Sequence, residues 1–224
     1  MNLLAIDTAC SNLSIAVSSE HGIFYTETKA ELRHSEIVMD MIDIQMKKAS
    51  LAPSCLDGVV CMGGPGSFTG LRIGYSIAKG LALSLSVPFV AVPTLDCMAS
   101  RYNGLVLSVI EARKNSWFFS VYQGERKIIP AAEAASIRIS DEITKTAETE
   151  NEEMTLTGSG AASLFPSLSH EAVERLIYNN ESYGYARELI AFVKKQNLLN
   201  NDNSAILYYG PEYIRKTDAE LNLR

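Results

Sequence analysis

One short segment constrains this chain more than any other, the glycine-rich stretch GGPGSFTGLRIG at residues 63–74. It follows an apolar run at 57–62, predicted to be a buried strand, and leads into a helix predicted over 69–85. Such a loop can present free N–H groups at a helix N-terminus to an anion such as phosphate. Alternatively, glycine lets the backbone pass closely beneath another element. The stretch lacks the Gly-Lys-Ser/Thr ending of a P-loop, so both interpretations stay open.

The helix after this loop carries a ridge of small residues at every fourth position: Gly70, Gly74, Ala78 and Ala82. Such a ridge allows another helix to approach closely. The sequence leaves open whether that helix is the one predicted over residues 35–48 of the same chain or a helix of a partner. Ile73 and Tyr75 lie off the main apolar stripe and favour an additional contact surface.

Strand and helix patterns divide the chain into two similar halves. Strands are predicted at 3–6, 13–17, 23–28, 57–62 and 89–92, with helices at 35–48, 69–85 and 95–102. The second half repeats this order, with strands at 105–110, 117–122, 127–129 and 154–157, helices at 141–150 and 185–195, and a glycine turn at 158–160. The pattern predicts an internal duplication.

The duplication predicts the α/β fold of actin-like ATPases (the ASKHA fold), in which two similar subdomains each combine a mixed sheet with helices. We place the subdomains at residues 1–103 and 104–224, with the last segment able to pack back on the first subdomain. In actin-like ATPases the nucleotide lies in the cleft between the subdomains.

The sequence offers weak candidates for a nucleotide or anion contact: Asp7, Gly64, Gly66 and Ser67. Asp7 ends the first strand, but the residues after it include no glycine to admit a phosphate, so a role in bracing the turn is the alternative. Glu111 and Arg113 end the first strand of the second half, where they could face the cleft or pair with each other. No partner base or metal set completes a mechanism around them.

Composition argues against several classes of function. The net charge is −6 and no basic run occurs, which argues against autonomous binding of nucleic acid. The longest apolar run, 80–92, is interrupted by Pro88 and is too short for a bilayer, and a strand begins where a leader would lie. We therefore expect a cytoplasmic protein with no membrane contact.

The four cysteines and three histidines do not predict a metal site. Cys10, Cys55, Cys61 and Cys97 have no short repeated spacing, and His21, His34 and His170 lie far apart. We expect reduced, mostly packed thiols.

Several segments resemble the TsaB family, also called YeaZ. They are Ile6-Asp7-Thr8, the block 64–74, Ala78-Lys79-Gly80-Leu81-Ala82, Glu111-Ala112-Arg113 and Pro211-Glu212-Tyr213-Ile214-Arg215. The central block is highly specific, whereas residues 127–203 carry little signal. The chain departs from the family at Glu111, where aspartate is usual, and at Ser116, where glutamate is frequent.

The resemblance implies a non-catalytic partner and scaffold of a TsaD-like enzyme, which transfers threonylcarbamoyl to adenosine 37 of tRNA. A TsaE-like ATPase would join the assembly, tRNA would be contacted only indirectly, and the chain would form a homodimer without its partner. No cofactor is expected on this chain alone, and ATP would act only at the level of the complex.

Docking in this family uses the first two helices, so the expected partner interface comprises Ile37, Met41, Ile44, Gly70, Ile73, Gly74, Tyr75 and Ala78. Two rival hypotheses stay open. One is an enzyme of the same superfamily, either a glycoprotease-like peptidase or an ATPase. The other is a purely structural homodimer.

Overall fold

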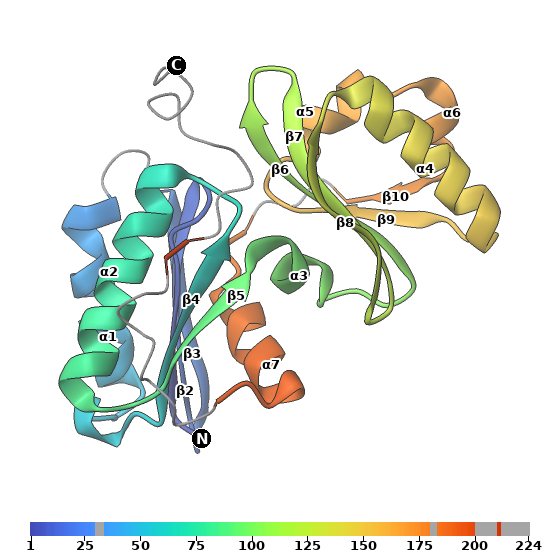
Figure 1. Ribbon diagram of the computed structural model, residues 1–224. Coiled ribbons are helices and arrows are strands. Elements are labelled where there is room, and N and C mark those ends of the chain that lie inside the picture. Colours follow the sequence, from blue (N-terminus) through green and yellow to red (C-terminus); the bar gives the residue numbers. More distant parts are fainter. Residues whose placement is uncertain (30–33, 180–182, 200–209, 212–224) are drawn as a thin grey trace.

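The computed structural model describes residues 1–29, 34–179, 183–199 and 210–211. Two α/β subdomains, each built around a five-stranded mixed sheet, lie side by side (Figure 1).

Sheet A forms the first subdomain, with strand order β3-β2-β1-β4-β5. The antiparallel meander consists of β1 (Leu3–Asp7), β2 (Asn12–Ser19) and β3 (Gly22–Lys29), and β4 (Gly58–Gly64) and β5 (Phe89–Pro93) continue the sheet in parallel with β1. A short 3-10 helix, Pro53–Cys55, precedes β4.

Helices cover both faces of sheet A (Figure 1). On one face lie α1 (His34–Lys48) and α2 (Phe68–Leu85), and on the other lie α3 (Thr94–Ala99) and α7 (Ala186–Gln196). Alternate residues of β1 therefore enter different cores: Leu4 packs toward α1 and α2, and Leu3 packs toward α3 and α7. This double burial explains why β1 is a continuous apolar run rather than an alternating one.

Sheet B forms the second subdomain, with strand order β10-β9-β6-β7-β8. Its meander consists of β6 (Leu105–Arg113), β7 (Ser116–Gln123) and β8 (Arg126–Ala134), and the parallel strands are β9 (Met154–Thr157) and β10 (Leu176–Tyr178). On its outer side lie α4 (Ser136–Glu150), α5 (Ala161–Leu164), the 3-10 helix Phe165–Ser167 and α6 (His170–Val173). The two sheets share one topology, which confirms the predicted duplication.

The helix α7 connects the two subdomains, because it packs on the sheet that is more distant in sequence. It follows sheet B in sequence but packs on β1, β2 and β4 of sheet A. The core beneath it includes Ile110 and Phe118 from sheet B. Apolar packing therefore continues from one subdomain into the other.

Candidate functional site

A groove of 520 Å³ lies between α1 and α2 on the outer side of the first subdomain. It is lined by Ser35, Met39, Phe68, Thr69, Arg72, Ile73, Ser76 and Ile77. Met39 is 48% exposed and Phe68 is 39% exposed. The Arg72 guanidinium lies 3.8 Å from the centre of the Phe68 ring, a cation–π contact that holds both at the edge of the groove. Large apolar side chains gathered around a groove are typical of a protein-binding surface.

The first helix has apolar residues on more than one side. Val38, Ile42 and Met46 are buried against sheet A, whereas Met39 and Ile44 are each 48% exposed. Apolar side chains of α1 therefore lie on its exposed side as well as on the side that packs against sheet A.

Four of the eight expected interface residues lie at or near the outer surface. Ile44 is exposed, Ile73 lines the groove, and Ile37 and Met41 are partly buried against the core. Whether a partner contacts them stays a prediction.

Two residues of the small-residue ridge on α2 face the turn that follows β1 and not a helix, which corrects the sequence interpretation at Gly70 and Gly74. Gly70 and Gly74 are buried against the turn that follows β1: a Cβ atom at Gly70 would overlap the Thr8 carbonyl oxygen, and one at Gly74 would lie 2.5 Å from Thr8 Oγ1. Ala78 is fully buried in the core over sheet A. Small side chains are required here because the helix lies close to its own sheet.

Tyr75 requires the same correction. It is 6% exposed, and its ring packs edge-on against Phe89 of β5 with 5.6 Å between centroids. It therefore belongs to the core rather than to an exposed contact surface, as do Gly70, Gly74 and Ala78.

The structure gives Asp7 a bracing role. Its side chain is fully buried, and its carboxylate accepts the Ala9 N–H at 3.1 Å and the Tyr185 N–H at 2.8 Å. Burial raises the pKa of Asp7 to about 6, although the two backbone hydrogen bonds act in the opposite direction. The alternative interpretation from the sequence, in which Asp7 braces the turn, agrees with these contacts.

The other three candidate anion contacts also have internal partners. Ser67 caps α2 by accepting the Gly70 N–H at 3.2 Å, and its own N–H donates to Ala9 O at 2.7 Å. Gly64 N–H donates to Thr94 Oγ1 at 3.1 Å, and a Cβ at Gly66 would lie 2.7 Å from Ala9 O. These contacts favour the interpretation in which the glycines of this loop let its backbone pass close to the turn after β1.

The glycine turn of the second subdomain follows the same rule. A Cβ at Gly158 would overlap Val109 O, and one at Gly160 would lie 2.5 Å from the Glu111 nitrogen. In both halves, glycine lets the loop cross the end of the first strand of the sheet.

Arg113 does not pair with Glu111. Its Nε lies 3.3 Å from Glu133 Oε1, and the Ser116 hydroxyl donates to the same oxygen at 2.7 Å. Glu111 is exposed. The role of Glu133 could not be predicted from the sequence, because no local pattern links β8 to the β6–β7 hairpin.

The cysteines are free thiols. Cys10, Cys61 and Cys97 are buried, and burial raises the pKa of each, whereas Cys55 is exposed on the 3-10 helix before β4. Within the described residues, no group of His, Cys, Asp or Glu could hold a metal ion. Over the same part of the chain, no helix is long and apolar enough to cross a bilayer.

Comparison with known proteins assigns the family. The model of the family described as TsaD, tRNA N6-adenosine threonylcarbamoyltransferase, matches residues 17–223. The tRNA threonylcarbamoyladenosine biosynthesis protein TsaB of Bacillus subtilis is 35% identical over 127 residues, and its namesake in Escherichia coli is 32% identical over 148 residues. The chain belongs to this family, in its TsaB (YeaZ) group. The alignments cover 55% and 64% of this chain and 56% and 64% of those two relatives.

Solved structures agree with the fold. YeaZ from Pseudomonas aeruginosa matches with a TM-score of 0.76 and 21% identity, covering 95% of this chain and 99% of that one. A second Pseudomonas aeruginosa protein, described as similar to peptidase YEAZ, gives a TM-score of 0.78 and 22% identity, covering 96% and 99%. The predicted fold class, two mixed-sheet α/β subdomains of the actin-like ATPase type, is confirmed. The motif residues 212–215 used in the sequence comparison lie outside the described residues.

Proposed function

We propose that this chain is a cytoplasmic, non-catalytic partner and scaffold of a TsaD-like enzyme in the threonylcarbamoylation of adenosine 37 of tRNA. The observation that carries the proposal is the apolar groove between α1 and α2, on a chain whose relatives are named tRNA threonylcarbamoyladenosine biosynthesis proteins. A TsaE-like ATPase would join the assembly, and any ATP would act at the level of the complex. The acidic net charge supports an indirect contact with tRNA.

The groove indicates the chemistry of the surface that would fill it. Met39, Phe68, Ile73 and Ile77 provide apolar walls, which suit large apolar side chains on a helix of the partner. Arg72 at the edge adds a positive charge beside the Phe68 ring, where a carboxylate of the partner could lie. The same face would join two copies of this chain when the enzyme is absent.

The non-catalytic role is supported by the hydrogen bonds that the candidate anion-binding residues make within the chain. The carboxylate of Asp7 and the backbone N–H groups of Gly64 and Ser67 each have a partner within the chain. A phosphate group would have to displace these internal contacts in order to bind.

Light scattering coupled to size-exclusion chromatography tests the proposal. We expect the chain mixed with the TsaD-like protein of the same organism to elute as a heterodimer that replaces its own dimer or monomer. Met39→Glu, which places a charge in the groove, should reduce that association at least about tenfold. Ile137→Glu is the matched control, since Ile137 is an equally apolar side chain, 75% exposed on α4 of the other subdomain. An unchanged elution profile with the wild-type chain would contradict the proposal.

Charged substitutions that test partner binding must avoid the buried small residues of α2. Arginine at Gly74 or glutamate at Ala78 would disrupt the core over sheet A, so lost binding would then report lost folding.

The rival hypothesis of a peptidase has one observation in its favour, the relative described as similar to peptidase YEAZ. Two histidines of the described chain, His21 and His170, lie on the surface, each 3.6 Å from a neighbouring glutamate. Hydrolysis of a peptide or of ATP by the purified chain would favour this rival.

A further inference from the structure

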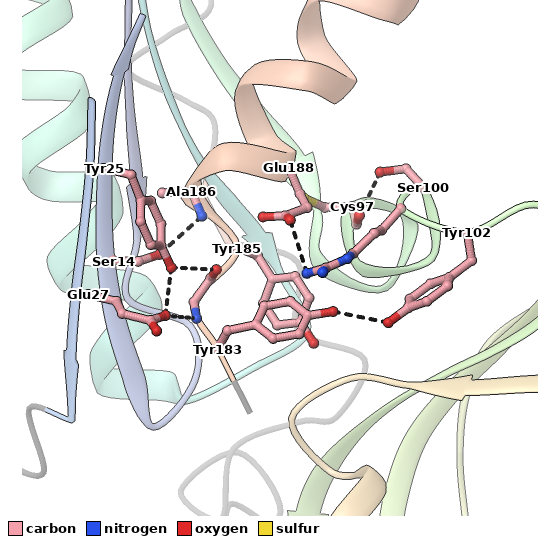
Figure 2. A network of polar contacts seen from close by, with 12 residues as sticks. Ser14, Tyr25, Glu27, Cys97, Ser100, Tyr102, Tyr183, Tyr185, Ala186 and Glu188 are labelled. Carbon is pink, nitrogen blue, oxygen red and sulfur yellow. Dashed lines mark hydrogen bonds and ion pairs between the residues drawn. The ribbon is translucent and has the colours of Figure 1, made fainter. Parts of the chain in front are cut away.

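The start of α7 is held by side chains from three strands of sheet A, and Figure 2 shows two of them, Ser14 of β2 and Glu27 of β3. Three successive backbone N–H groups donate to them: Gly184 to Glu27 of β3 at 2.5 Å, Tyr185 to Asp7 of β1 at 2.8 Å and Ala186 to Ser14 of β2 at 3.0 Å. Tyr185 is the N-cap of α7 and Ala186 is its first residue, so two of these three N–H groups belong to the donors that a helix N-terminus leaves without a partner inside the helix. We call this set of three hydrogen bonds the α7 anchor.

Further contacts close the α7 anchor. The Tyr25 hydroxyl lies 2.6 Å from Glu27 Oε2 and 2.9 Å from Gly184 O (Figure 2). The Arg187 guanidinium stacks on the Tyr25 ring at 4.3 Å. A Cβ atom at Gly184 would overlap the Ser14 side chain. The helix start therefore has one closely fitted position on the sheet.

The turn at residues 7–9, which we call the β1 turn, connects this anchor with α2. Asp7 binds the start of α7 with one oxygen and the Ala9 N–H with the other. Ala9 O then accepts the Ser67 N–H at 2.7 Å, and the Thr8 hydroxyl donates to Gly70 O at 2.7 Å. A continuous set of buried hydrogen bonds thus runs from the α7 anchor to the first turn of α2.

The two ends of this path serve different parts of the molecule. The first two turns of α2 carry Phe68, Thr69 and Arg72, which line the groove. At the other end, the buried side chain of Tyr185 belongs to the same apolar core as Ile110 and Phe118 of sheet B, so the start of α7 also lies against the second subdomain.

We propose that the β1 turn couples the seating of α7 on sheet A to the position of the first turn of α2. A partner that orders the groove would then strengthen the α7 anchor, and a loosened anchor would weaken the groove by the same factor, because coupling between two sites is reciprocal. An effect of the α7 anchor on partner binding rests on the proposed function. The coupling between the α7 anchor and the first turn of α2 is a property of the chain alone. The bistable element is the start of α7, seated or released.

Amide hydrogen exchange of the isolated chain tests the coupling. Glu27→Ala and Ser14→Ala each remove one acceptor of the α7 anchor and leave the β1 turn and α2 unaltered in sequence. Glu27 is exposed, so its replacement leaves the core intact. We expect the amides of Ser67, Gly70 and Leu71 to exchange about fivefold faster in both variants, the effect of losing one ordinary hydrogen bond from a shared opening.

Ser140→Ala is the matched control. Its hydroxyl also accepts a backbone N–H before a helix, that of Ser169, but in the second subdomain. In this variant the exchange of residues 67–71 should stay unchanged. Faster exchange at residues 184–190 without any change at 67–71 in Glu27→Ala and Ser14→Ala would overturn the coupling, and so would unchanged exchange at both places. Both readouts use the chain alone, so a failure of the coupling is distinguishable from a failure to bind a TsaD-like protein.

Discussion

Replacing Asp7 by asparagine should change how the stability of this protein depends on pH. Asp7 is fully buried, and burial raises its pKa from 3.8 to about 6. A protonated carboxyl and an amide have nearly the same shape, with one acceptor and one donor end each. The variant therefore resembles the wild type with Asp7 protonated, at every pH.

The size of the effect follows from the two pKa values. A carboxyl group with a raised pKa in the folded state stabilises the fold fully below pH 3.8, and that contribution is lost as the pH rises through 6. The difference of roughly two units corresponds to about 3 kcal/mol at 1.36 kcal/mol per unit. The free energy of unfolding of the wild type, minus that of Asp7→Asn, should fall by most of this amount between pH 4 and pH 7, since pH 4 lies just above the unfolded-state pKa of 3.8.

Urea unfolding at pH 4, 5, 6 and 7, followed by circular dichroism, measures this difference. Ser140→Ala is the control because it removes the acceptor of one backbone N–H, that of Ser169 in the second subdomain, without removing a titrating group. The free energy of unfolding of this control should lie below that of the wild type by a similar amount at each pH. A difference between wild type and Asp7→Asn that is constant, or that rises with pH, would refute the argument from burial.

Four further substitutions test the packing. Gly70→Ala should destabilise the fold by at least about 2 kcal/mol in urea unfolding, since its Cβ would overlap a backbone oxygen; Gly80→Ala, with nothing within 4 Å, should stabilise it by about 0.5–1 kcal/mol. Gln45→Met should raise the thermal midpoint and add about 1–2 kcal/mol, because both polar atoms of this buried amide lack a partner in the described structure. Asp96→Asn should weaken the link between α3 and sheet B, where Asp96 accepts from Tyr122 at 2.6 Å, and lower stability by about 1–2 kcal/mol in urea unfolding.

Most strands and long helices were predictable from residue patterns, for identifiable physical reasons. Side chains repeat with a period of two in a strand and of 3.6 in a helix. The residue patterns of strands such as β1 and β4 therefore differ from those of α1 and α2. The exceptions are short elements. Strand β10 has three residues and α5 and α6 have four each, too few to display a period. The helix predicted at 95–102 ends earlier, at Ala99.

The candidate site was predictable only in part. Four of the expected interface residues lie at or near the outer surface: Ile37, Met41, Ile44 and Ile73. The α2 residues Phe68 and Arg72, which form the rim of the groove, were not among the expected interface residues. Their pairing gives a signal that the sequence could have supplied, an aromatic and an arginine four residues apart on one helix face.

The sequence by itself determined the duplicated order of strands and helices, the glycine turns and the family. Tertiary structure decided which neighbour each face meets. Helical spacing places Gly70, Gly74 and Ala78 in one row, but a row of small residues fits a closely packed sheet as well as a helix. The position of α7 on sheet A was decided in the same way, because Asp7, Ser14 and Glu27 become one binding site for its N-terminus only after three strands are side by side.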